Sequence, residues 1–188
     1  NIINYHGTPG LGMDHAYYSP WYEWFTMQTP MYYASPSFVP DGWRYAIYCF
    51  GNPLVWYGGL AGVVYLAIRW LRNHRYRVPG SGHAWQISAR TWDVAPAFVL
   101  IGLAAQLLPW VLVPRGTYIY RYFASVTFLI LGTVVMLDRL TYRYPIIRGI
   151  TLFLLLGAAL VLFILLFPYA SGVLTPNGWL DFVRDYPW

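Results

Sequence analysis

ITLFLLLGAALVLFILLF, at residues 150–167, decides the class of this protein. The stretch contains no charged residue, and its one polar side chain is that of Thr151. An α-helix needs about 20 predominantly apolar residues to cross the hydrocarbon core of a bilayer. The stretch therefore predicts a membrane-spanning helix at residues 149–167.

Three further stretches have the length and apolar character of membrane spans, at residues 52–71, 94–113 and 119–137. Of the 188 residues, 58% are hydrophobic and 10% are charged, against roughly 45–50% and 25% in a soluble domain. We therefore expect an all-α integral membrane protein with four transmembrane helices. Its parts would be an extracytoplasmic interfacial segment at residues 1–51, the four-helix region at 52–167 and an extracytoplasmic tail at 168–188.

The charged residues exclude several functional classes. All twelve basic residues are arginines, and they flank the hydrophobic stretches instead of gathering on one solvated face, so the net charge of +5 does not indicate a nucleic-acid partner. The single cysteine, Cys49, excludes an intrachain disulfide. His6, Asp14, His15 and Glu23 match no ligand spacing, so we expect neither a metal ion nor another cofactor.

The arginines also predict how the helices are oriented, because loops rich in Lys and Arg stay on the cytoplasmic side. Two loops hold eight of them, namely Arg69, Arg72, Arg75, Arg77 and Arg90 in the first and Arg139, Arg143 and Arg148 in the second. The other loops and the tail hold Arg44, Arg115 and Arg184. Both ends of the chain are therefore expected on the extracytoplasmic side.

Two stretches outside the spans have the composition of membrane-surface segments. SPWYEWFTMQTPMYY, at residues 19–33, mixes large aromatic residues with prolines. Ser19 suits an N-cap and Pro20 a first helical position, so we expect a short interfacial helix from Pro20 to about Thr29. Residues 176–188, with Trp179, Phe182 and Trp188, resemble a second interfacial piece.

Gly58 and Gly62, four residues apart in the first span, form a small-xxx-small pattern that allows a close approach of two helices. Such matches also arise by chance in membrane helices, so a packing role and no role both stay open.

The connector PWVLVPRGTYIYRYFAS, at residues 109–125, carries the first candidate site. A helix that begins near Thr117 would align one polar face, made of Tyr118, Arg121, Tyr122 and Ser125, opposite an apolar face, made of Ile119, Phe123, Val126 and Ile130. Arg115 would lie just above Arg121. Arginines at this depth bind an anion or extend to the headgroups as anchors. The first alternative makes Arg115, Tyr118, Arg121 and Tyr122 candidates for binding the phosphate of a lipid-linked donor.

A second candidate site lies in the aromatic segment, where Glu23 stands between Trp21, Tyr22 and Trp24. Rings that cover the apolar face of a sugar, beside a carboxylate that accepts its hydroxyls, suit carbohydrate binding. The alternative is an interfacial anchor whose one charge faces water. We take Trp21, Glu23, Trp24 and the preceding His15 as candidates for sugar or acceptor binding.

Several motifs together resemble one family. NYH (4–6), HAYYSPWYEW (15–24), MYY (31–33), GNP (51–53) with Trp56, and LLPWVLVPRGTYIYRYF (107–123) occur in the order found in the C-terminal four-helix region of dolichyl-phosphate-mannose-protein mannosyltransferases. The resemblance implies a glycosyltransferase that moves mannose from a polyprenyl phosphate to Ser or Thr of an acceptor protein. It also implies that the catalytic base lies in an upstream part of the same enzyme.

The resemblance favours the bacterial type and hence a bacterial plasma membrane, with the endoplasmic reticulum as the alternative. The implied partners are the polyprenyl-phosphate-mannose donor, the acceptor protein, membrane lipid and the rest of the enzyme. A non-enzymatic four-helix subunit or a transporter fragment is the other functional class. A transporter would show broken helices and polar groups near mid-membrane, for which Gln106 and Pro109 are the two hints.

Overall fold

The computed structural model describes residues 9–34, 38–73 and 94–178. In this part of the chain, four long helices are apolar enough to cross a membrane: α2 (Pro53–Asn73), α3 (Val94–Val111), α4 (Phe123–Thr141) and α5 (Pro145–Ser171). The four predicted spans are thus confirmed as helices. The helix α5 extends beyond the predicted stretch at both ends.

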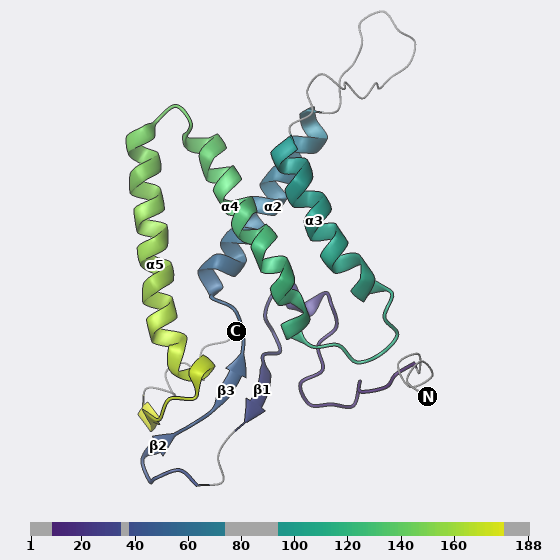
Figure 1. Ribbon diagram of the computed structural model, residues 1–188, viewed down its shortest axis with the longest axis vertical. Helices are drawn as coiled ribbons and strands as arrows, with labels where there is room; N and C mark the ends of the chain where they lie inside the picture. The colour runs from purple at the N-terminus through teal and green to yellow at the C-terminus, as the bar shows by residue number, and fades with distance from the viewer. Residues whose placement is uncertain (1–8, 35–37, 74–93, 179–188) are drawn as a thin grey trace, which may run out of the picture.

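The four helices run alternately up and down (Figure 1). The start of α2, the end of α3, the start of α4 and the end of α5 lie at one end of the molecule, together with the short strands. We call this the strand end; it comprises the described parts of residues 9–52, 112–122 and 172–178. The turn between α4 and α5 lies at the opposite end.

Glycines bring α2 and α4 close together. A Cβ added to Gly62 would stand 2.5 Å from the carbonyl carbon of Gly132, and one added to Gly59 would meet the backbone of Leu129. Of the pattern formed by Gly58 and Gly62, only Gly62 takes part in this close contact, since a Cβ on Gly58 would find just the Thr133 hydroxyl, at 4.0 Å. In an α-helix, residues three apart lie on the same face, as residues four apart do. The close contact with α4 therefore involves Gly59 and Gly62 instead of Gly58 and Gly62.

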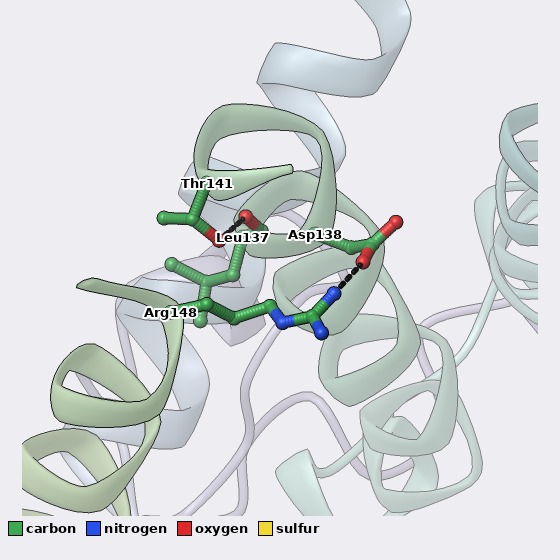
Figure 2. A network of polar contacts seen from close by, with 4 residues as sticks. All are labelled: Leu137, Asp138, Thr141 and Arg148. Carbon is green, nitrogen blue, oxygen red and sulfur yellow. Dashed lines mark hydrogen bonds and ion pairs between the residues drawn. The ribbon is translucent and has the colours of Figure 1, made fainter. Parts of the chain in front are cut away.

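Within the helix α5, only Leu166 and Tyr169 are buried. At the turn that joins it to α4, Arg148 donates to Asp138 at 3.0 Å, as Figure 2 shows. Both side chains are about half exposed, so this ion pair contributes at most about 1 kcal/mol.

A second link to α5 comes from Asn52, next to the start of α2. Its side-chain oxygen accepts from the backbone N–H groups of Leu54 and Val55, at 3.1 and 3.4 Å. Its amide nitrogen donates to the carbonyl of Ala159 in α5, at 2.9 Å. The residue thus caps one helix and bonds to the middle of another.

The interfacial helix expected at Pro20–Thr29 is absent, and the structure has only the 3₁₀ turn η1 (Glu23–Phe25) there. The reason is that the carbonyl and hydroxyl oxygens of Ser19 accept from the indole N–H of Trp24, at 3.1 and 3.0 Å. Ser19 is thus not available as an N-cap. In addition, Met27 has a left-handed φ of 51°, which ends the helical path.

Four short strands, which no sequence pattern indicated, organise the rest of the strand end. The strand β1 (Met31–Ala34) pairs antiparallel with β3 (Ile47–Cys49), and β2 (Trp43–Arg44) pairs with β4 (Thr175–Pro176). The second pair joins the segment after α5 to the segment before α2. The expected tail anchors Trp179, Phe182 and Trp188 lie outside the described residues, as do Arg75, Arg77, Arg90 and Arg184.

Two tryptophans fasten the segment before α2 to the helices. Trp24 and Trp56 are 0% and 1% exposed, and the indole N–H of Trp56 donates to the carbonyl of Trp24 at 2.8 Å. Ser19 and Thr117 exchange two further bonds: the Ser19 N–H donates to the Thr117 carbonyl at 3.0 Å, and the Thr117 hydroxyl donates to the Ser19 carbonyl at 2.8 Å. Segments that are 98 residues apart in sequence are therefore joined directly.

Two backbone hydrogen bonds hold the same connector at a second place, around residue 115. The Gly10 N–H donates to the carbonyl of Pro114 at 2.8 Å, and the Gly116 N–H donates to that of Leu11 at 2.7 Å. A side chain on Gly116 would collide with the backbone of Gly12. Arg115 is thus carried by a backbone fixed on both sides.

Replacing Gly62 with alanine should destabilise the protein, because the new methyl group would meet the backbone of Gly132, which cannot turn aside. We expect a loss of about 1–3 kcal/mol, as for other overpacked sites. The measurement is the midpoint of thermal unfolding of the detergent-solubilised protein. Gly58→Ala is the matched control and should keep or raise the midpoint, because the added group has space and alanine favours helix. Equal midpoints for the two variants would contradict the close approach of α2 and α4.

Thr117→Val should loosen the link between the connector and the first segment by removing the hydroxyl that donates to Ser19. One neutral hydrogen bond contributes about 1 kcal/mol, so amide hydrogen exchange at Ser19 should be about fivefold faster. Thr26→Val is the control, because it removes an exposed hydroxyl bonded to the Glu23 carbonyl. Unchanged exchange at Ser19 in the Thr117 variant would show that its hydroxyl does not hold the segment.

Candidate functional site

The connector between α3 and α4 differs from the expected single helical face. Tyr118 is extended, with φ −142° and ψ 151°, and the 3₁₀ turn η3 (Ile119–Tyr122) follows it before α4 begins. Ile119, Tyr122 and Ser125 are all buried. Residues three apart share a face both in a 3₁₀ turn and in an α-helix, so Ile119 and Tyr122 of η3 and Ser125 of α4 form one inward row. The predicted faces differ at Ile119, which is buried with Tyr122 and Ser125, whereas Phe123 and Ile130 of the expected apolar face are exposed.

Arg121 lies against aromatic rings at the strand end. Its guanidinium carbon is 4.7 Å from the centroid of the Trp110 ring and 5.4 Å from that of Tyr120. Tyr120 in turn stacks on Tyr118, with the ring planes 10° apart. A guanidinium on aromatic faces is oriented while its N–H groups stay available at the ring edges. Arg121 is thus held in one direction by rings.

Tyr122 and Trp24, one candidate from each predicted site, meet in the core. Their ring centroids are 6.2 Å apart, and Tyr122 also packs on Trp56 at 4.9 Å and Phe25 at 5.8 Å. Tyr122 and Trp24 are both 0% exposed. In the described part of the structure, the Tyr122 hydroxyl is buried without a hydrogen-bond partner. These two rings thus belong to the buried core that underlies the other candidate residues.

His15 and Tyr118 bring the two predicted sites together at the surface. Their rings meet edge to face, with centroids 5.4 Å apart. The backbone N–H of Tyr17 donates to His15 Nδ1 at 3.2 Å, so a neutral His15 carries its proton on Nε2. The exposed His15 therefore offers one donor beside the Tyr118 ring.

Glu23 and Trp21 lie on or next to the η1 turn. The Thr29 hydroxyl donates to Glu23 Oε2 at 3.2 Å, which leaves the other carboxylate oxygen for further partners. Trp21 packs edge to face on Tyr22 at 5.8 Å and on Phe25 at 6.2 Å. The turn thus splits the aromatic motif, because Trp24 points into the core while Glu23 is only half-buried. Within the described residues, no three His, Cys, Asp or Glu side chains form a group that could hold a metal ion.

A pocket of about 320 Å³ at the strand end was not predicted. Its walls come from four separate parts of the chain, and it is lined by Ala16, Tyr17, Gln28, Thr29, Pro30, Tyr48, Phe50 and Tyr169. These residues do not follow one helical or strand period, so no local pattern identifies them. The one signal in the sequence is the excess of tyrosine, 18 residues in the chain.

Comparison with known proteins places this geometry in a family. The structure resembles a solved Saccharomyces cerevisiae complex, the protein O-mannosyltransferase Pmt1–Pmt2 complex bound to the sugar donor, with a TM-score of 0.69 and 16% sequence identity. The match covers 92% of this chain and 23% of the yeast chain, and at this identity it shows the fold alone. Among curated protein sequences the comparison finds no match. The family described as the C-terminal four-transmembrane region of protein O-mannosyltransferase matches residues 3–181, and the chain therefore belongs to this family.

Proposed function

We propose that this chain is the membrane part of an enzyme that transfers mannose from a polyprenyl-phosphate donor to Ser or Thr of an acceptor protein. Membership in the protein O-mannosyltransferase family supports a glycosyltransferase. The observation that carries the proposal is the fixed connector at the strand end, which carries Arg115 three residues before Tyr118 and holds Arg121 against Tyr120. The Tyr120 ring stacks on Tyr118, which in turn contacts His15. The alternative of a transporter has less support, because α3 continues through Pro109 as far as Val111.

In this proposal Arg115 and Arg121 bind the donor phosphate. An arginine offers two parallel N–H groups to a phosphate, and the bond is stronger at a membrane surface than in bulk water. The connector backbone is fixed by its bonds to Gly10 and Leu11, so little conformational entropy is lost when the anion binds. Tyr118 supplies a hydroxyl nearby. Tyr122 would support this site from the core.

The sugar or the acceptor would lie over the first segment. Trp21 and the Nε2–H of His15 offer a ring face and a donor, and the free oxygen of Glu23 offers an acceptor. Trp24 would contribute by holding the η1 turn in place. We expect the general base that takes the proton from the Ser or Thr hydroxyl to come from an upstream part of the enzyme.

The strand end is proposed to face the extracytoplasmic side of a bacterial plasma membrane, with both ends of the chain on that side and the endoplasmic reticulum as the alternative location. The described arginines support this orientation, because Arg69, Arg72, Arg139, Arg143 and Arg148 lie toward the opposite end. The lipid donor and the acceptor protein would then meet at the strand end.

Arg115→Ala in the complete enzyme should weaken apparent donor affinity by about ten- to a hundredfold, since a charged hydrogen bond contributes ~1.5–3 kcal/mol. Arg115→Lys should recover part of the loss, because it keeps the charge but not the bidentate geometry. The measurement is steady-state kinetics with varied lipid donor. Arg143→Ala is the control, at an exposed position near the α4–α5 turn. A folded Arg115→Ala enzyme with wild-type donor KM and turnover would make Arg115 an interfacial anchor instead.

Single cysteines test the orientation. In a cysteine-free form of the complete enzyme, which includes Cys49→Ser, Asp41→Cys should react with a membrane-impermeant maleimide in intact cells. Tyr142→Cys, at the α4–α5 turn, should react only after the cells are opened. Both positions are exposed, so access to the thiol is limited by the membrane and not by burial. The reverse labelling pattern would overturn the proposed orientation.

A further inference from the structure

The pocket of about 320 Å³ at the strand end is distinct from the arginine site. Its volume lies at the lower end of the roughly 300–1,000 Å³ found for small-molecule sites. Ala16 and Gln28 are exposed and mark its mouth, while Tyr169, 9% exposed, marks its floor. The pocket therefore has the size and form of a binding site for a small group.

Its walls are aromatic rings set at angles to one another. Tyr48 and Tyr169 have centroids 6.0 Å apart and planes tilted by 53°, and Phe50 meets Tyr169 edge to face at 6.4 Å. Such walls present flat apolar faces in more than one direction. A pyranose ring has one apolar face of C–H groups, which such a wall can cover.

The polar groups of the pocket are neutral. Gln28 and Thr29 provide an amide and a hydroxyl, and none of the described lining residues carries a charge. Burial raises the pKa of Tyr48, against a smaller opposite effect of Arg44, so the Tyr48 hydroxyl stays protonated at neutral pH and can donate. Neutral donors and acceptors beside ring faces suit a neutral sugar. A wholly aliphatic chain would offer no hydrogen-bonding group to the Gln28 amide or the Tyr48 hydroxyl.

A row of rings connects this pocket to the arginine site. It runs from Tyr118 through His15, Tyr17, Tyr32 and Tyr48 to Tyr169, and successive centroids are 5.2–6.0 Å apart. The pocket and the proposed phosphate site thus lie on one continuous aromatic surface. A polypeptide lying across this surface can reach both.

We propose that the pocket binds a neutral hexose already attached to the acceptor polypeptide, so that the enzyme retains a mannosylated segment while it modifies the next hydroxyl. The proposal rests on the proposed function. The sugar of the donor is a less suitable occupant, because it is esterified directly to an anionic phosphate and no described lining residue is a cation.

Binding is tested on the complete enzyme in nanodiscs by saturation-transfer NMR. The probes are a peptide with one α-mannosyl threonine and the same peptide without the sugar. The wild-type enzyme should bind the mannosyl peptide and not the plain one. Gln28→Ala should weaken that binding about fivefold, the effect of one neutral hydrogen bond. Ala16→Phe should abolish it by filling the mouth, whereas Ala34→Phe, at an exposed residue of β1 outside the pocket, should not.

Transfer of mannose from the lipid donor is measured in parallel, as the ratio of rates on the mannosyl peptide and on the plain peptide. Gln28→Ala and Ala16→Phe should each lower this ratio. Three results would each overturn the proposal. They are equal binding of the two peptides, wild-type binding by both pocket variants, and displacement of the mannosyl peptide by polyprenyl-phosphate mannose. A wild-type enzyme that transfers no mannose would refute the proposed function, and its peptide binding would still decide the pocket assignment.

Discussion

The peptide groups of the segment before α2 need hydrogen-bond partners that regular secondary structure does not provide. Two indole N–H groups, those of Trp24 and Trp56, satisfy two of these groups by donating to the carbonyls of Ser19 and Trp24. Buried polar groups without partners are costly, so these bonds determine how the segment lies on the helices. Thr117 then joins the same carbonyl of Ser19 to the connector. Both candidate sites are held in place through this small network.

The helices were predictable because the bilayer imposes a simple rule. A span needs sufficient length and apolar character, and four stretches meet that requirement in a chain with 10% charged residues. The arginines and tyrosines of the connector, and the carboxylate among the rings of the aromatic segment, identified both as functional candidates. Those inferences depended on sequence features that are local and independent of packing.

Features that depend on which of several groups forms a given hydrogen bond were not predictable from local sequence patterns. Ser19 and Pro20 have the pattern of a helix start, but the Trp24 indole takes the capping oxygens. At the connector, the 3₁₀ turn brings Ile119, which was expected on the apolar face, into the core beside Tyr122. The pocket was missed for another reason, since its walls come from segments far apart in sequence.

The bond between Asn52 and Ala159 sets the relative depth of two helices. Ala159 lies twelve residues before the end of α5 at Ser171, which is about 18 Å along a helix axis. The helix α2 therefore begins beside the middle of α5, where hydrocarbon would surround α5 on its other side. Lipids next to this pair meet two apolar lengths that are offset, a mismatch that bilayers accommodate by thinning locally. The membrane beside the strand end is thus expected to be locally thinner, with its headgroups closer to the start of α2.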